Sequence, residues 1–254
     1  MRKSDTTLID PADVVAALGL LSRLPLRVDM EKAQARGARA AWAYPVAGAC
    51  LGALTALIIS IALWIGISPV VAAGLALITI TMMTGAMHED GLADSFDGLW
   101  GGWDREKRLA IMKDSQIGTY GVLALVLSIG LRWMALATIV AAEFHWPALI
   151  AIGAVSRAAM VPVMAALPHA RPDGLSRHVG RPPAQVAWIA LSLAFMICLL
   201  ALGVITIWIV LVGFVVTSIW AATARQKIGG QTGDILGATQ QMNELALLIL
   251  MTSL

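Results

Sequence analysis

Charged residues are scarce in this sequence. Asp, Glu, Lys and Arg make up only 13% of the 254 positions, whereas hydrophobic residues make up 59% and the mean hydropathy is +0.80. Soluble domains are typically about a quarter charged. A water-soluble fold could not hide so much apolar surface, so the composition excludes an ordinary soluble domain and indicates that part of the surface faces lipid.

A strong net charge and a cysteine framework are also missing. The formal net charge is only +2, which gives no reason to expect a nucleic-acid partner. The two cysteines, Cys50 and Cys198, lie far apart within apolar runs, and we interpret them as packing residues rather than metal ligands. Residues 1–11 are polar and contain no apolar h-region, so no cleaved signal peptide is expected.

Long apolar runs, by contrast, are abundant. Several approach the ~20 residues that an α-helix needs to cross roughly 30 Å of hydrocarbon. We place seven of them at 42–65, 69–87, 118–141, 146–167, 184–203, 205–222 and 235–254. Because Gly203 alone separates the fifth from the sixth, the count is six to seven. We therefore predict an all-α, polytopic integral membrane helical bundle, with residues 1–254 as a single catalytic domain in the lipid bilayer.

The distribution of Lys and Arg predicts the orientation. Seven lie in residues 1–40, four in 88–117, three in 168–183 and two in 223–234, which is 16 of the 18 in the chain. By the positive-inside rule these segments face the cytoplasm, which predicts a multi-pass protein of the cell inner membrane. Arg23 and Pro25 break the apolar stretch 13–26, so we expect an interfacial or re-entrant helix in the N-terminal segment 1–40.

An acidic centre follows the second predicted span. Glu89, Asp90, Asp94 and Asp97 lie within nine residues, next to His88. On a continuing helix the three aspartates fall within about 60° of one another and form one stripe. Since close carboxylates repel and a hard divalent cation relieves the repulsion, we predict a metal site with Glu89, Asp90, Asp94 and Asp97 as ligands, and Mg²⁺ as its ion. The alternative is a solvated acidic loop.

Cationic and catalytic candidates follow in the same cytoplasmic segment, 88–117. Arg105, Arg108 and Lys113 could contact phosphate oxygens, and Asp114 is a further acid. The alternative for the two arginines is anchoring at the membrane surface. The loop 168–183 contributes Arg171 and Arg177, which either cover an anionic substrate or only set the topology.

A second candidate segment opens the last predicted span. Gly229, Gly230, Thr232 and Gly233 form a glycine-rich loop that leads directly into a helix, an arrangement that binds phosphate through free amide groups. Asp234 follows, and we predict a catalytic contribution from it, although capping the helix is a compatible role.

Three charged residues lie inside predicted spans. Glu244 shares a helical stripe with Asp234 and Gln241, and Arg132 and Arg157 lie in the third and fourth spans. An unpaired charge in the membrane is costly, so we expect Glu244 to pair with Arg157 or Arg132 and to hold the last helix with Asp234 facing the acidic centre.

The chain resembles the cobalamin synthase family, the adenosylcobinamide-GDP ribazoletransferases. The resemblance is carried by residues 20–25, 88–98, 111–118, 156–157, 170–175 and 232–238. The string His-x-Asp-Gly-Leu-Ala-Asp-x-x-Asp-Gly is long and specific, and Ser22 stands where threonine is expected. The resemblance implies that the 3′-hydroxyl of α-ribazole or its 5′-phosphate attacks adenosylcobinamide-GDP, that GMP leaves, and that Mg²⁺ is required. For this reaction His88 is a candidate base, with Asp90, Lys113, Asp114 and Asp234 as further catalytic residues.

Two other functions fit part of the sequence. A CDP-alcohol phosphotransferase also displays spaced aspartates at the membrane surface, but its motif has an arginine where Asp94 follows Ala93. A cation or metabolite transporter would place its site near the midplane and often shows inverted repeats, whereas these acids cluster at one surface. A homo-oligomer is compatible with either function.

Overall fold

The computed structural model describes residues 7–254. In this part of the chain the secondary structure is helical, apart from one isolated β-bridge between His169 and Gln231. The elements are α1 Ala12–Leu21, α2 Met30–Arg36, η1 Gly37–Ala43, α3 Tyr44–Trp64, α4 Pro69–Thr84, α5 Met87–Gly101, α6 Arg105–Ile111, α7 Thr119–Ala141, α8 His145–Ala158, α9 Met160–Ala166, α10 Leu175–Val179, α11 Ala184–Leu202, η2 Gly203–Ile205, α12 Thr206–Ile228 and α13 Gly233–Met251. The predicted all-α fold is confirmed.

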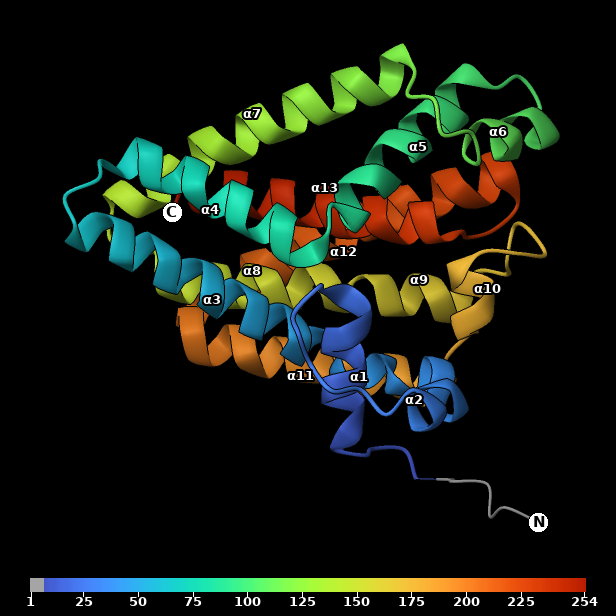
Figure 1. Ribbon diagram of the computed structural model, residues 1–254, viewed down its shortest axis with the longest axis horizontal. Helices are drawn as coiled ribbons and strands as arrows, with labels where there is room; N and C mark the ends of the chain where they lie inside the picture. The colour runs from blue at the N-terminus through green and yellow to red at the C-terminus, as the bar shows by residue number, and fades with distance from the viewer. Residues whose placement is uncertain (1–6) are drawn as a thin grey trace.

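The helices form an elongated bundle around α13 (Figure 1). In the view of Figure 1, α7 lies on one side of α13, and α8, α9 and α11 lie on the other. The short helices α6 and α10 gather at one end, together with the loops that connect them. The C-terminal end of α5 reaches the same end.

Four helical stretches are long and apolar enough to cross a membrane, and the bent pair α4–α5 makes a fifth if it counts as one span. The four are Met30–Trp64, Thr119–Ala141, His145–Ala166 and the 45-residue Ala184–Ile228, which contains both α11 and α12. The seven predicted spans are all helical in the structure. The last of them, α13, is not among the helices that are long and apolar enough to cross a membrane. Its buried face carries Gln240, Gln241, Asn243 and Glu244, so α13 is a central helix covered by its neighbours.

The N-terminal segment packs against the bundle. The ten-residue α1 is too short to cross a membrane. The Asp13 carboxylate is 1% exposed and accepts hydrogen bonds from Arg36 and from the indole nitrogen of Trp42. This buried ion pair ties α1 to α2 and to η1. That residues 1–40 lie at the cytoplasmic membrane surface stays a prediction.

Candidate active site

A sharp bend in the backbone presents the acidic helix. Gly85 and Ala86 are both left-handed, with φ of 64° and 57°, and they end α4 and turn the chain by 88° into α5. A β-carbon at Gly85 would collide with the side chain of Arg23, whose amide donates to the Met83 carbonyl. The strained bend therefore also holds the Arg23–Pro25 segment, and His88 to Asp97 follow it at once.

The acids of α5 meet Asp234 of α13. The two helices pack with their backbones almost in contact, since a β-carbon on Gly91 would lie only 2.9 Å from the Asp234 carbonyl oxygen. Asp90 is exposed and Asp94 is half-buried. The charges that act most strongly on Asp94 are the carboxylates of Asp90 and Asp234. Two helices that are far apart in sequence thus build one acidic cluster.

Arg171 is the cation of this cluster. Its Nη1 lies 3.3 Å from Oδ2 of Asp234, and within the described chain neither Nη1 nor Nε has a hydrogen-bond partner. Burial raises the pKa of the Asp234 carboxyl above its ordinary value, and Arg171 and the Thr232 hydroxyl oppose this shift. A guanidinium with unused donors beside carboxylates is suited to bind a phosphate group.

Both carboxylate oxygens of Asp97 are occupied by backbone hydrogen bonds. Its two carboxylate oxygens accept hydrogen bonds from the amides of Gly118, at 2.7 Å, and Gly121, at 2.9 Å. A β-carbon on either glycine would collide with this carboxylate. The structure thus uses Asp97 to cap the N-terminus of α7, which departs from its predicted role as a metal ligand.

Glu89 and His88 also depart from their predicted roles. The Glu89 carboxylate is 7% exposed and accepts from Arg132 at 3.3 Å and from Gln241 at 3.1 Å. His88 is 1% exposed and packs where α5 meets Gly237 of α13. Both side chains point into the bundle because they lie on the opposite side of α5 from Asp94, so neither is placed to hold a metal or to reach a substrate hydroxyl.

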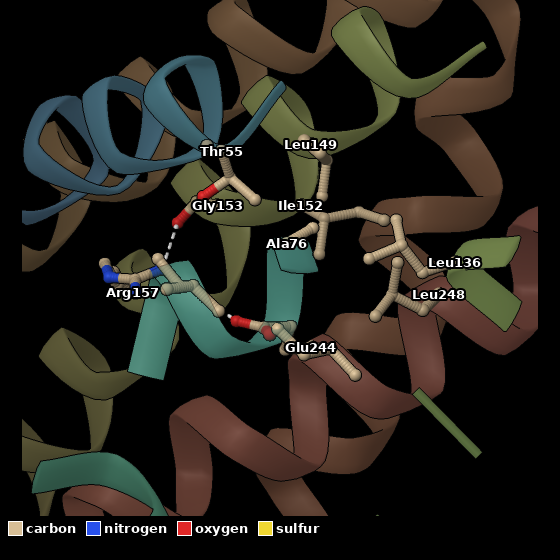
Figure 2. A pocket seen from close by; sticks show the side chains of 12 residues that line it. Thr55, Ala76, Leu136, Leu149, Ile152, Gly153, Arg157, Glu244 and Leu248 are labelled. Atoms are coloured by element: carbon tan, nitrogen blue, oxygen red, sulfur yellow. Dashed lines mark hydrogen bonds and ion pairs between the residues drawn. The ribbon is translucent and has the colours of Figure 1, made fainter. Parts of the chain in front are cut away.

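The predicted pairing of Glu244 is confirmed, and both arginines take part. Arg132 Nη2 donates to Glu244 Oε1 at 2.5 Å, and Arg157 Nη1 lies 4.0 Å from Glu244 Oε2. Figure 2 shows Arg157 between the Gly153 carbonyl and Glu244, at the edge of a small cavity. Charges placed inside the membrane region thus neutralise one another.

The two predicted loops meet through a short backbone bridge. The Gln231 amide donates to the Pro168 carbonyl at 2.8 Å, and the Ala170 amide donates to the Gln231 carbonyl at 2.9 Å. Gly230 is required at this contact, because a β-carbon there would collide with the Pro168 carbonyl. This bridge places Arg171 next to Asp234.

Three residues of these loops were missed by sequence reasoning. Ser176 donates to Gln231 Oε1, and Gln231 Nε2 lies 3.0 Å from Nδ1 of His169. The sequence offers no spacing signal for this set, because its members come from separate loops.

The glycine-rich segment serves local geometry. Gly229, with φ of 77°, ends α12, and the Thr232 hydroxyl accepts from the Ile235 amide and so caps α13. Gly233 is the first residue of α13, and a β-carbon added to it would meet open space. The prediction that these residues bind phosphate stays a prediction.

The cations that precede α7 have partners of their own. Arg105 donates to the carbonyls of Ile228 and Ala170, and Arg108 donates to those of Gly102 and Lys227. Both arginines thus attach α6 to the end of α12. Their role in phosphate binding stays a prediction, and only the part of each guanidinium that these bonds leave unused could serve it.

An exposed ion pair connects the loop 168–183 to the segment before α7. Lys113 Nζ lies 2.5 Å from Oδ2 of Asp173, and this ammonium lowers the pKa of the Asp173 carboxyl. Asp114 and Arg177 are exposed, and the Asp114 carboxylate accepts from the Gln116 amide. The site is therefore bordered by groups that remain accessible.

The carboxylates of the acidic cluster are the groups that could bind a metal ion. Within residues 7–254, no three side chains of His, Cys, Asp or Glu converge closely enough to hold one. The chemistry still fits a hard cation, since Asp90, Asp94 and Asp234 offer carboxylate oxygens whose mutual repulsion a cation would relieve. Of the four predicted ligands, Asp90 and Asp94 remain suited to this role.

Comparison with known proteins covers nearly the whole chain. The model of the family described as "Cobalamin-5-phosphate synthase" matches residues 13–252. A Bradyrhizobium diazoefficiens protein named adenosylcobinamide-GDP ribazoletransferase is 46% identical, over 94% of this chain and 92% of its own. Proteins of the same name from Allorhizobium ampelinum and a Sinorhizobium species are each 41% identical, over 93% of this chain and 94% of theirs. No solved structure matches.

Proposed function

The chain belongs to the cobalamin-5-phosphate synthase family, and on this basis we propose that it is an adenosylcobinamide-GDP ribazoletransferase. It joins α-ribazole, or its 5′-phosphate, to adenosylcobinamide-GDP and releases GMP, which forms adenosylcobalamin or its 5′-phosphate. The observation that carries the proposal is the meeting of Asp90 and Asp94 with Asp234 and Arg171 at one end of a helical membrane bundle.

The reaction is a substitution at phosphorus. The 3′-hydroxyl oxygen of the ribazole forms a bond to the cobinamide-side phosphorus, the bond from that phosphorus to the bridging oxygen of GMP breaks, and the hydroxyl proton is lost to a base. Negative charge develops on the oxygens of the diphosphate, and Arg171 is placed to neutralise part of it. The bridge between residues 168–170 and Gln231 holds this arginine in position.

The proton acceptor is one of the accessible carboxylates. His88 is buried against α13 and cannot reach a hydroxyl outside the bundle. Asp90 and Asp114 are both exposed. We therefore propose Asp90 or Asp114, rather than His88, as the base that accepts the hydroxyl proton.

Mg²⁺ is part of the proposal. Asp90, Asp94 and Asp234 would contribute carboxylate oxygens to it, because these are the ligands that it prefers, and Arg171 is the cation beside them. When bound, the ion would supply positive charge to the diphosphate oxygens and assist the departure of GMP.

The orientation in the cell completes the proposal. The multi-pass helical bundle would lie in the inner membrane with α6, α10 and the acidic cluster on the cytoplasmic side, where nucleotide-activated substrates are found. The excess of Lys and Arg in the segments at this end supports this orientation.

The direct test is GMP release by the purified protein in detergent. We expect release only when both adenosylcobinamide-GDP and α-ribazole phosphate are present. Replacing the donor by a CDP-alcohol should give no nucleotide release. A transporter would form no GMP in this assay, because it moves its substrate without breaking a bond. A folded protein that releases no GMP would therefore contradict the proposal.

A further inference from the structure

One buried guanidinium joins the two helices that carry the acids. Arg132 of α7 is 1% exposed. Its Nη2 donates to Glu244 Oε1 at 2.5 Å, and its Nη1 donates to Gln241 Oε1 at 2.7 Å and to Glu89 Oε1 at 3.3 Å. Glu89 belongs to α5, and the other two acceptors belong to α13.

These acceptors lie close to the acids in sequence. Glu89 directly precedes Asp90, and Gln241 lies two helical turns after Asp234. Gln241 Nε2 also donates to Glu89 Oε1 at 3.1 Å. The group of Glu89, Arg132, Gln241 and Glu244, which we name the Arg132 network, therefore links α5 to α13 through buried side-chain hydrogen bonds.

The backbones of α5 and α13 also approach each other closely. Each of these approaches has a glycine on one side, with Gly91 against Asp234 and Gly237 against the Cα of His88. Glycines offer no side chains that would interlock. A rotation of α5 by one residue, about 100°, would move Asp94 away from Asp234.

We propose that Arg132 is a positioning residue for the transfer reaction. By binding Glu89 on one helix and Gln241 with Glu244 on the other, it holds Asp90 and Asp94 opposite Asp234. This inference rests on the proposed function, because it concerns the rate of that reaction.

Arg157 supplies a matched control. It is also 1% exposed and also faces Glu244, but at 4.0 Å, and it donates to the Gly153 carbonyl of its own helix, at 3.4 Å. Within residues 7–254 it donates no hydrogen bond to α5. Figure 2 shows its position beside a cavity of about 30 Å³ that is lined mostly by apolar side chains. Arg157 thus shares the charge and the burial of Arg132 but not its link to α5.

Charge balance allows the two roles of Arg132 to be separated. Two arginines, Arg132 and Arg157, face two glutamates, Glu89 and Glu244. Replacing either arginine by methionine leaves one negative charge in excess and should lower stability. Arg132→Met combined with Glu89→Gln restores neutrality, since Arg157 remains for Glu244, but it does not restore the hydrogen bonds by which Arg132 joins residue 89 of α5 to Gln241 and Glu244 of α13.

The experiment measures the melting temperature, kcat and KM of Arg132→Met, Arg157→Met and the double variant in detergent. Both single variants should have a lower melting temperature than the wild type. Only Arg132→Met should lose kcat, by about 100-fold, as expected for small misplacements of reacting groups. KM for adenosylcobinamide-GDP should stay near the wild-type value, because Arg171 lies on a different element. The double variant should regain melting temperature but not kcat.

Two outcomes would overturn the inference. One is recovery of kcat together with melting temperature in the double variant, and the other is an equal loss of kcat in Arg157→Met. Either would reduce Arg132 to a buried counter-ion. Absence of GMP release from the wild-type protein would instead contradict the proposed function.

Discussion

Arg171 and Asp234 are joined across two loops, with 3.3 Å between Nη1 and Oδ2. The arginine belongs to the loop after α9, and the aspartate lies in the first turn of α13. The backbone bridge at Gln231 brings them together. The pair places a cation and a carboxylate from different parts of the chain at the point where we expect the diphosphate to bind.

Replacing Arg171 should weaken substrate binding. Charge-assisted hydrogen bonds contribute about 1.5–3 kcal/mol, so we expect Arg171→Gln to raise KM for adenosylcobinamide-GDP by roughly 10–100-fold. Arg181→Gln is the control, since Arg181 is exposed in the same segment, 168–183, and donates to the Ala165 carbonyl. Steady-state kinetics of GMP release would measure both variants. Equal KM values for the two variants would remove Arg171 from the binding site.

Asp97 should behave as a helix cap. Asp97→Ala leaves the amides of Gly118 and Gly121 without their acceptor, and each unsatisfied buried donor costs about 1–3 kcal/mol. We therefore expect a lower melting temperature, while the Mg²⁺ concentration that gives half-maximal activity changes little. A stable variant with a strongly raised Mg²⁺ requirement would restore Asp97 as a metal ligand.

The difference between the Asp97 prediction and its observed role shows what sequence reasoning could reach. The spacing of Asp90, Asp94 and Asp97 correctly predicted one helix with an acidic stripe. It could not show that α7 begins beside Asp97 and takes both of its oxygens. Which face of α5 meets which helix is decided by tertiary packing, and the left-handed bend at Gly85 and Ala86 gave no periodic signal.

The charged residues inside spans were more predictable. An acid in the membrane requires a partner wherever it lies, so the pairing of Glu244 with an arginine followed from composition alone. That Arg132 also reaches Glu89 did not follow, because Glu89 was counted with its neighbour Asp90. Asp234 was identified by its position before a helix, but its contact with the α5 acids depends on the close approach at Gly91.

Removing the charge of Glu244 should lower stability. Glu244→Gln leaves Arg132 and Arg157 with Glu89 as the remaining acid, and an unbalanced buried charge typically costs about 3–5 kcal/mol. Glu244→Gln combined with Arg157→Gln should recover part of this loss, since Arg132 then pairs with Glu89. Thermal unfolding in detergent would measure both. A fully stable but inactive Glu244→Gln would instead assign Glu244 to catalysis.

Cysteine labelling tests the orientation. With Cys50 and Cys198 replaced by alanine, a cysteine at Ile67 or Phe144 should react with a membrane-impermeant reagent added to intact cells. A cysteine at Trp103, which is 92% exposed, or at Leu175 should react only after lysis. The reverse pattern would place the acidic cluster in the compartment that lacks nucleotide-activated substrates.

The central claim is that the acids of α5 and α13 form the site of transfer. It is tested most directly by GMP release from adenosylcobinamide-GDP and α-ribazole phosphate, measured with wild type and Asp94→Ala, each with and without Mg²⁺. Glu106→Gln, on the exposed surface of α6, is the control. We predict Mg²⁺-dependent release by the wild type and the control, and a loss of several orders of magnitude in a folded Asp94→Ala, because the variant loses a ligand of the ion that stabilises the developing charge. Near-normal release by Asp94→Ala at moderate Mg²⁺ would contradict the account.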